Sequence, residues 1–418
     1  MAGTILAMPN GNFLSHMSRP LAIAKKLREM GYNVVFAGDG DYMKLPRNDG
    51  FEVHTIKTID LEYSLSVSRK GRLSWYDYST IDEHVQAELA LFAKVQPDLV
   101  LNDFRPTLGT SCEMANIPLV CILNASWTNY STVRVRAPDH LRVTQILGRG
   151  ICDAIAPMIK EYVLKKDSAP FRQYRKDKAL SQKVNMMDIW TGDLNLLTDI
   201  PEYGPTQNLP GNFRYIGPIT WEPDLTEPEW LAKLDPQKTT LYFTMGSTGF
   251  PRFFEQAIEL FKDLAYQCIM TTGGMVDIPN SPPNFYITDF APGSALLAKS
   301  DVVICHGGNG TIYQALGQGV PIIGIPTMHD QEFNLDRVEA LGVGIQLNEL
   351  KFKPIHLLDA IKLILTNKEF KQNAEKYKQH LCQYNGPLTG ALLIAEYLEN
   401  KTTQFANELH ISKRTLQD

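Results

Sequence analysis

Short aliphatic runs alternate with helical patterns along most of this 418-residue chain. The alternation predicts parallel sheets wrapped by helices, because parallel strands need crossover connections that are usually helical. Two sets of strands are expected, each made of short β-branched or aliphatic runs. The first set lies at residues 4–8, 33–37, 51–56, 98–102 and 119–124, and the second at 241–244, 267–271, 285–287, 301–305 and 320–325. We therefore expect an α/β fold.

Two domains are expected, because the chain is longer than a single hydrophobic core usually serves. Prolines and glycines crowd residues 201–218, which marks a linker between the two sets of strands. Doubly wound, Rossmann-like domains are predicted at residues 1–205 and 206–385, followed by a helical tail. Such sheets bind ligands at the carboxyl ends of their strands, so two substrates would meet in a cleft between the domains.

Two helices stand out between the predicted strands. For the first, Ser18 is placed to cap the helix, Pro20 suits its first turn and Gly31 suits its end. The second helix is expected at residues 253–265.

Composition narrows the class of protein. With 41 basic and 46 acidic residues the formal net charge is −5, which argues against a nucleic-acid partner. The six cysteines stand singly, so neither a zinc site nor a disulfide framework is predicted. No apolar run is long enough to span a membrane. We expect a cytoplasmic protein, monomeric or homodimeric, with peripheral membrane contact left open.

The segment His306-Gly307-Gly308-Asn309-Gly310-Thr311 follows a predicted strand, and a helix is expected over residues 311–317. Free backbone N–H groups and the dipole at a helix start attract a diphosphate. The glycines let the backbone come close to it, and His306 and Thr311 add donors. After the next strand come Asp330, Gln331 and Asn334, whose carboxylate and amides suit sugar hydroxyls, although they also suit a turn or a helix cap. The combination predicts a nucleotide-sugar site.

This pattern resembles the donor signature of family 1 glycosyltransferases: His-x-Gly-x-x-Ser/Thr-x-x-Glu-Ala, then Gly-Val-Pro, then Asp/Glu-Gln-x-x-Asn. Only Gln314 departs from it, where the family usually has Glu. The resemblance implies a GT-B fold, with two Rossmann-like domains facing across a cleft. It also implies a nucleotide-sugar donor, with UDP favoured over dTDP, no cofactor and no metal. The last helix, at about residues 386–418, would cross back onto the N-terminal domain.

A base is expected from the N-terminal half. His16 lies between the first strand and the first helix, and histidine suits proton removal from a hydroxyl near neutral pH. Asp103, at the end of a strand that reaches the same sheet edge, is expected to orient it. Alternatively, His16 is a solvated loop residue and Asp103 caps a helix near Thr107. The family motif Gly-His-x-x-Pro is similar, with Ser15 replacing the glycine here and the proline displaced to position 20.

Further donor contacts follow from the resemblance. Gly246, Ser247 and Thr248 follow a predicted strand where the family binds phosphates. Phe290 would stack on the base, while Gly293 replaces the family's Gln. Gln314 would bond the ribose. The predicted donor set is Gly246, Ser247, Thr248, Phe290, His306, Gly307, Gly308, Asn309, Gly310, Thr311, Gln314, Asp330 and Gln331.

The acceptor site is expected in two loop-rich regions, at residues 61–78 and 125–190, which carry many aromatics. The predicted contacts are Asn12, Phe13, Trp75, Trp127 and Tyr130. The aromatics would equally serve to close the domain core or a dimer surface. A basic stretch at residues 165–178 would face a membrane or an anionic acceptor, or simply be a solvated helix face.

The sequence therefore predicts an inverting glycosyltransferase that moves a hexose, glucose from UDP-glucose, to a hydroxyl of a small hydrophobic or aromatic acceptor such as a natural product. Two alternatives are a nucleotide-sugar epimerase or hydrolase and a non-catalytic protein that activates a partner enzyme. Asp39-Gly40-Asp41 resembles a metal motif of another glycosyltransferase class, but Gly- and Asp-rich turns are ordinary after a strand, and we reject that interpretation.

Overall fold

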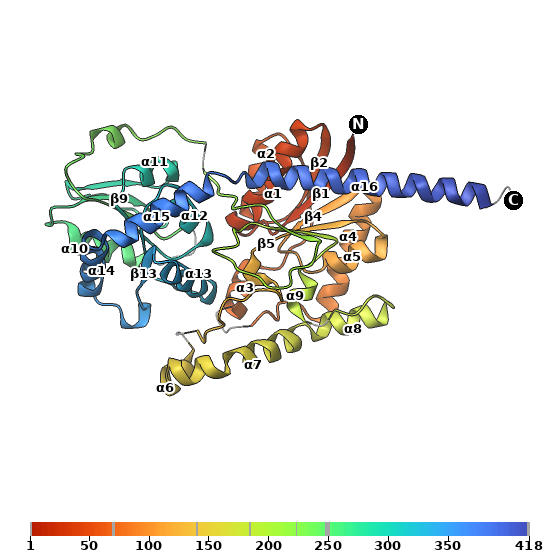
Figure 1. Cartoon of the computed structure of the whole chain (residues 1–418), viewed down its shortest axis with the longest axis horizontal. Coiled ribbons are helices and arrows are strands. Elements are labelled where there is room, and N and C mark those ends of the chain that lie inside the picture. The colour runs from red at the N-terminus through yellow and green to blue at the C-terminus, as the bar shows by residue number, and fades with distance from the viewer. Residues whose placement is uncertain are drawn as a thin grey trace.

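The computed structural model describes residues 2–68, 72–138, 141–183, 185–222, 224–246 and 251–415. They form two α/β domains, each with one parallel sheet (Figure 1). The N-terminal sheet has the order β3-β2-β1-β4-β5-β6-β7, and the C-terminal sheet has the order β10-β9-β8-β11-β12-β13. Within the described chain, no helix is both long and apolar enough to cross a bilayer.

The strands are short. Those of the N-terminal sheet are β1 (Ala2–Pro9), β2 (Tyr32–Gly38), β3 (Glu52–Thr55), β4 (Leu99–Asp103), β5 (Leu119–Leu123), β6 (Leu194–Leu197) and β7 (Phe213–Tyr215). Those of the C-terminal sheet are β8 (Thr240–Thr244), β9 (Gln267–Thr271), β10 (Phe285–Thr288), β11 (Val302–Cys305), β12 (Ile322–Gly324) and β13 (Gly344–Gln346).

Helices cover both sheets. Those before the linker are α1 (Leu14–Glu29), α2 (Lys44–Asn48), α3 (Leu61–Ser68), α4 (Tyr78–Val95), α5 (Leu108–Ala115), α6 (Arg142–Leu147), α7 (Arg149–Asp167), α8 (Ala169–Asp177) and α9 (Met186–Ile189). Those after it are α10 (Arg252–Phe261), α11 (Gly293–Ala298), α12 (Asn309–Gly317), α13 (His329–Ala340), α14 (Pro354–Thr366), α15 (Lys368–Leu381) and α16 (Gly386–Thr415).

All ten predicted strands are present, whereas β6, β7 and β13 were not predicted. None of the three is a continuous aliphatic run, because β6 contains Asn195, β7 contains Arg214 and β13 begins with Gly344. The expected domain boundary at 205/206 lies too early, because β7 pairs with β6 in the N-terminal sheet. The proline- and glycine-rich stretch thus contains the last strand of the first domain.

The start of α1 also differs from the prediction. The helix begins at Leu14, with Phe13 as its N-cap and no side-chain cap, so Ser18 and Pro20 lie inside it. A turn in which Asn10 Oδ1 accepts the N–H of Asn12 precedes the helix and starts it early. Pro20 has no N–H for the carbonyl four residues back, that of His16. Because the helix begins at Leu14, His16 lies in its first turn rather than in a loop.

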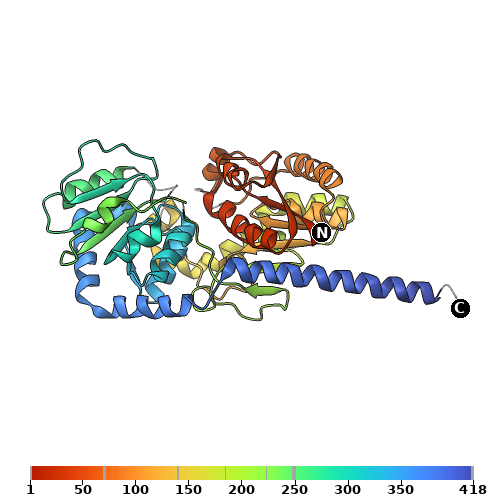
Figure 2. The same cartoon turned by 90° about the horizontal axis from the view of Figure 1, so that it is seen from above.

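The helix α16 returns to the N-terminal domain, as the resemblance implied (Figures 1 and 2). Ala391 and Ile394 are buried in a core cluster with Ile23 of α1 and Ile216. At Gly390 a side chain would lie 2.9 Å from Ile23, so the glycine permits the close approach. The last helix of the chain therefore packs against its first helix.

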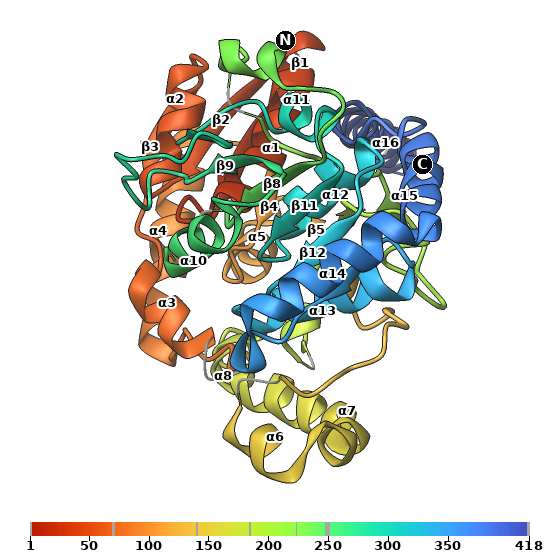
Figure 3. The same ribbon diagram turned by 90° about the vertical axis from the view of Figure 1, so that its left-hand side faces the viewer.

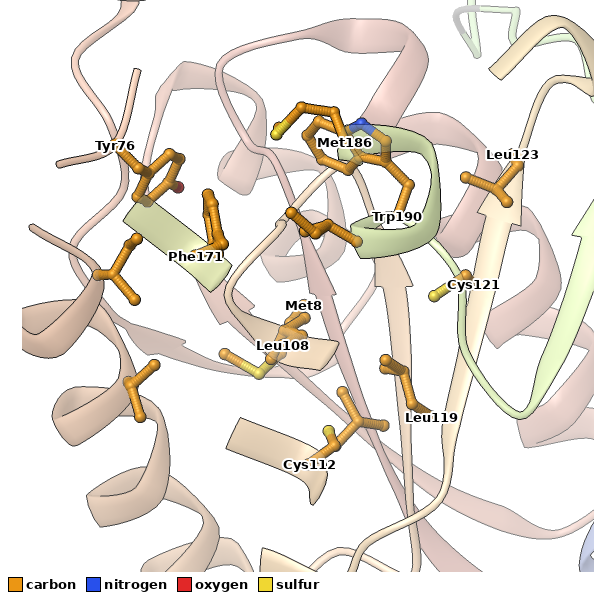
Figure 4. Packing of buried hydrophobic residues seen from close by; sticks show 14 of the residues in the cluster. Met8, Tyr76, Leu108, Cys112, Leu119, Cys121, Leu123, Phe171, Met186 and Trp190 are labelled. Carbon is orange, nitrogen blue, oxygen red and sulfur yellow. The ribbon is translucent and has the colours of Figure 1, made fainter. Parts of the chain in front are cut away.

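The opposite face of the N-terminal sheet has its own core (Figure 4). Here α8 and α9 contribute Phe171, Met186 and Trp190, which pack with Met8 and Cys121 of the sheet. Each sheet is thus buried on both sides, which explains its continuous apolar strands.

Candidate active site

Both sheets reverse their strand order at one point, which is where doubly wound folds bind ligands. In the N-terminal domain the reversal lies between β1 and β4, and in the C-terminal domain between β8 and β11. Register pairs Pro9 with Asp103 at the first point and Thr244 with Cys305 at the second. The predicted base and the predicted glycine turn follow directly at these strand ends.

The predicted catalytic pair is in contact. His16 Nδ1 lies 2.7 Å from Asp103 Oδ1. The Asp103 side chain is fully buried, while the imidazole keeps 20% of its side-chain surface exposed. The helix α5 has Thr107 as its N-cap and no side-chain cap, so Asp103 does not cap it. A buried carboxylate that accepts from Nδ1 leaves Nε2 of the ring as the proton acceptor.

Arg19, one turn after His16, was not predicted. Its guanidinium binds Asp103 through two hydrogen bonds, Nε to Oδ2 at 2.9 Å and Nη2 to Oδ1 at 2.7 Å. Nη2 also lies 3.0 Å from His16 Nδ1. That nitrogen can donate to Asp103 or accept from Arg19, but not both. Because the charged carboxylate is the stronger partner, we assign the proton to Nδ1, and Arg19 then holds the carboxylate in place.

An aromatic platform lies under the imidazole. Phe104 stacks on His16 with ring centroids 4.3 Å apart, and Trp190 stacks on Phe104 at 4.5 Å. Phe104 has φ of +65°, a left-handed conformation that is rare for a bulky residue. Such strain persists where the surroundings impose it, and it is common at functional sites. The turn after Asp103 thus brings the ring beneath the base.

The surroundings keep the imidazole neutral. Burial lowers the pKa of His16 and outweighs the Asp103 carboxylate, which raises it; the positive charge of Arg19 lowers it further. Asp330, from the other domain, raises it, and the His16 charge in turn lowers the pKa of Asp330, which burial raises. A neutral ring at physiological pH is the form that accepts a proton.

Asp330 approaches from the C-terminal domain. It lies in the first turn of α13, and its carboxylate interacts electrostatically with His16. Asp330 is exposed to solvent. Enough protein atoms nevertheless lie around its carboxylate for desolvation to raise its pKa. The predicted base and a predicted sugar ligand therefore meet between the domains.

The predicted glycine turn is built around His306. A side chain at Gly246 or Gly308 would come within 2.6 Å of the imidazole, so both glycines lie against it. His306 is buried, its Nδ1 has no hydrogen-bond partner among the residues that the structure describes, and burial lowers its pKa to about 4. Helix α12 begins at Asn309, two residues earlier than predicted. An unpaired imidazole nitrogen beside a helix start suits an anionic ligand.

Two neighbours shape this turn. Gly307 has φ of +90°, and a side chain there would strike Leu335 at 2.7 Å. Asn334 Nδ2 donates to the carbonyl of Gly307 at 3.0 Å. Gln331 is buried, and its Oε1 accepts hydrogen bonds from the N–H and hydroxyl of Thr327. Asn334 and Gln331 thus brace the loops, and sugar contact by Gln331 stays a prediction.

The expected base and ribose contacts lie near one another. Phe290 is 54% exposed, so its ring face is free to stack. A side chain at Gly293 would lie 3.1 Å from Gln314 Oε1, and Gln314 Nε2 donates to the carbonyl of Trp221 at 2.7 Å. Ser247 and Thr248 lie outside the described residues. The remaining predicted residues, Gly310 and Thr311, lie in the first turn of α12.

The predicted acceptor residues separate into two groups. Phe13 packs edge-on against His16, and Trp75 and Trp127 pack against Phe104. Tyr130 instead packs on Phe213 of β7. Asn12 uses its side-chain amide to hold the carbonyl of Ile59. Phe13 and Trp127 are partly exposed and join the aromatic platform at the base, whereas Trp75 is buried in the domain core behind it and Tyr130 packs against the same core.

A chain of hydrogen bonds leads from the base to the donor domain. Arg19 Nη1 donates to Asn124 Oδ1 at 2.8 Å, and Asn124 Nδ2 lies 3.3 Å from both carboxylate oxygens of Asp199. Tyr313 of α12 donates its hydroxyl to Asp199 at 2.9 Å. Burial raises the pKa of Asp199. This polar network ties the helix after the glycine turn to the catalytic pair.

Comparison with known proteins places the chain. A "PGL/p-HBAD biosynthesis glycosyltransferase" of Mycobacterium tuberculosis is 33% identical over 374 residues, covering 89% of this chain and 87% of that protein. The chain is a family 1 glycosyltransferase. The model of the erythromycin biosynthesis protein CIII-like C-terminal domain matches residues 262–387 of this glycosyltransferase. A "PGL/p-HBAD biosynthesis rhamnosyltransferase" of Mycobacterium bovis is 32% identical, with 89% and 83% covered.

The fold agrees with solved glycosyltransferases. The calicheamicin glycosyltransferase CalG4 superposes with a TM-score of 0.70 at 17% identity, covering 96% of this chain and 99% of that one. The predicted GT-B fold, with two parallel-sheet domains, is confirmed.

Proposed function

We propose that this glycosyltransferase moves a hexose from a nucleotide diphosphate sugar to a hydroxyl of a small hydrophobic or aromatic acceptor, with inversion at the anomeric carbon. The carrying observation is the His16–Asp103 pair, 2.7 Å apart, within electrostatic range of Asp330 on the donor domain. His16 supplies the base and Asp330 lies where the sugar would be.

The reaction balances as a single displacement. The acceptor O–H gives its proton to His16 Nε2, and the oxygen forms a bond to the anomeric carbon. The bond from that carbon to the diphosphate oxygen breaks, and its electron pair leaves with the nucleoside diphosphate. Asp103, held by Arg19, stabilises the imidazolium. The start of α12 and His306 stabilise the leaving diphosphate.

The acceptor class follows from the platform at the base. Three partly exposed rings, those of Phe13, Phe104 and Trp127, lie around His16 or its stacking partner. Flat apolar surfaces favour an acceptor with a hydrophobic or aromatic body. The names of the two mycobacterial relatives refer to PGL and p-HBAD biosynthesis, which supports a natural product as acceptor.

For the donor we propose UDP-glucose. A second candidate is a dTDP-deoxyhexose, because one relative is named a rhamnosyltransferase. Calorimetric titration with UDP and dTDP, followed by transfer assays with both donors and a panel of phenols, distinguishes them. Inversion is read from the anomeric coupling constant of the product by NMR. Binding of neither nucleotide would overturn the proposal and favour the non-catalytic alternative.

A further inference from the structure

The helical hairpin α6–α7 stands off the N-terminal domain at the edge of the molecule (Figures 1 and 3). One face of α7 presents Ile151, Ile155, Met158, Ile159 and Tyr162, which are 40–75% exposed. Their spacing of three and four residues makes a single apolar stripe. Ile146 of α6 is 80% exposed and extends the apolar surface.

The fold does not need this stripe. The opposite face of α7 is the one that packs: Cys152 and Ala156 form a small cluster with Ala137, and Leu164 is buried in the domain core. Long apolar side chains gathered on one exposed face mark an interaction surface rather than chance exposure.

Charge indicates what covers the stripe. The hairpin, residues 142–167, holds five basic and three acidic side chains, whereas the whole chain has an acidic excess, and the acidic Asp167 is buried in an ion pair with Arg72. Arg142, Lys165 and Lys166 are exposed beside the apolar face. A second copy of the chain would bring two positively charged surfaces together, which is unfavourable. An apolar stripe flanked by Lys and Arg is instead the pattern of helices that lie in the surface of an anionic bilayer.

The hairpin is also attached to both sides of the site. Arg136, just before α6, forms an ion pair with Asp336 of α13, the helix that carries Asp330. The helix α8, directly after α7, places Phe171 in the same core cluster as Trp190, which stacks on Phe104. A surface that binds α7 therefore lies beside the chain segments that enclose the base.

We propose that the α6–α7 hairpin docks this enzyme on an anionic lipid surface, with the α7 stripe in the acyl boundary and the basic side chains at the headgroups. Membrane docking does not require sugar transfer, so it is tested independently of the proposed function.

Vesicle co-sedimentation of the full-length protein tests this. Phosphatidylcholine vesicles with and without phosphatidylglycerol are compared at low and high salt. The variant Ile151→Gln/Met158→Gln/Tyr162→Gln changes only exposed side chains. The matched control Ile355→Gln/Leu363→Gln/Leu392→Gln removes exposed apolar side chains of 50–53% exposure elsewhere.

The expected result is salt-sensitive binding to the anionic vesicles that falls about tenfold or more in the α7 variant and in Lys165→Glu/Lys166→Glu, but not in the control. Absence of binding by the wild type, equal binding to neutral vesicles, or equal loss in the control would each overturn the proposal. So would a wild-type dimer that the α7 variant converts to monomers, since a second copy would then cover the stripe.

Discussion

Acid should destabilise the donor domain through His306. The imidazole is 6% exposed, its Nδ1 is unpaired within the described part of the chain, and burial lowers its pKa to about 4 from the ordinary 6.5. Between these values the unfolded chain binds a proton that the folded chain does not. The free energy of unfolding therefore falls as the pH decreases from 6.5 to about 4. The lowered pKa of His306 corresponds to a loss of about 3 kcal/mol in the free energy of unfolding over this pH range.

The assay compares wild type with His306→Gln, whose amide stays neutral at every pH. Denaturant unfolding is followed by hydrogen exchange in β11 and α12 between about pH 7 and pH 4. His84, whose pKa burial lowers to about 4, contributes its own slope in both proteins. The variant should lose only the part of the slope that His306 contributes, about 3 kcal/mol between pH 6.5 and about 4, and His356→Gln, at an exposed position, is the matched control. If the slope were unchanged in His306→Gln, the burial of His306 would not contribute to the pH dependence of stability.

Three substitutions test the other parts of the site. Arg19→Met removes the positive charge that lowers the His16 pKa, so the acid limb of the kcat/KM profile should move to higher pH. It should also lower the free energy of unfolding by about 3 kcal/mol, because Asp103 loses a buried partner; an unmoved limb would show that Arg19 does not tune the base. Gly307→Ala forces φ of +90° and a clash with Leu335, so UDP affinity should fall and stability drop by about 1–3 kcal/mol. Gly317→Ala, where nothing lies within 4 Å, is its control and should cost nothing. Phe290→Ala should weaken nucleotide binding by about 1–3 kcal/mol in calorimetry without changing the unfolding midpoint; unchanged affinity would exclude base stacking.

The fold was largely readable because its strands are buried on both faces. Runs such as 241–243 and 268–270 are apolar without interruption, and the glycine turn marks the donor end of β11. The strands β6, β7 and β13 were missed because a polar residue or a glycine interrupts each short apolar run.

The contact between His16 and Asp103 was predictable for a topological reason: the carboxyl ends of β1 and β4 are neighbours in the sheet. Its supports were not. Nothing local shows that Arg19 turns inward to bind Asp103 or that Phe104 adopts φ of +65°. Both depend on long-range packing, which overrides local preference. The α7 stripe has the spacing of an ordinary core face, and only the structure shows that it is exposed.

The proposed mechanism depends on His16 as the base that accepts the proton of the acceptor hydroxyl. The direct measurement is the initial rate of sugar transfer by His16→Ala, alongside calorimetric UDP binding and the control His356→Ala, at an exposed position. The transfer rate of His16→Ala should be lower by about 10²–10⁴-fold, while its UDP affinity and the rate of the control stay unchanged. A variant that transfers sugar at the wild-type rate would contradict this mechanism.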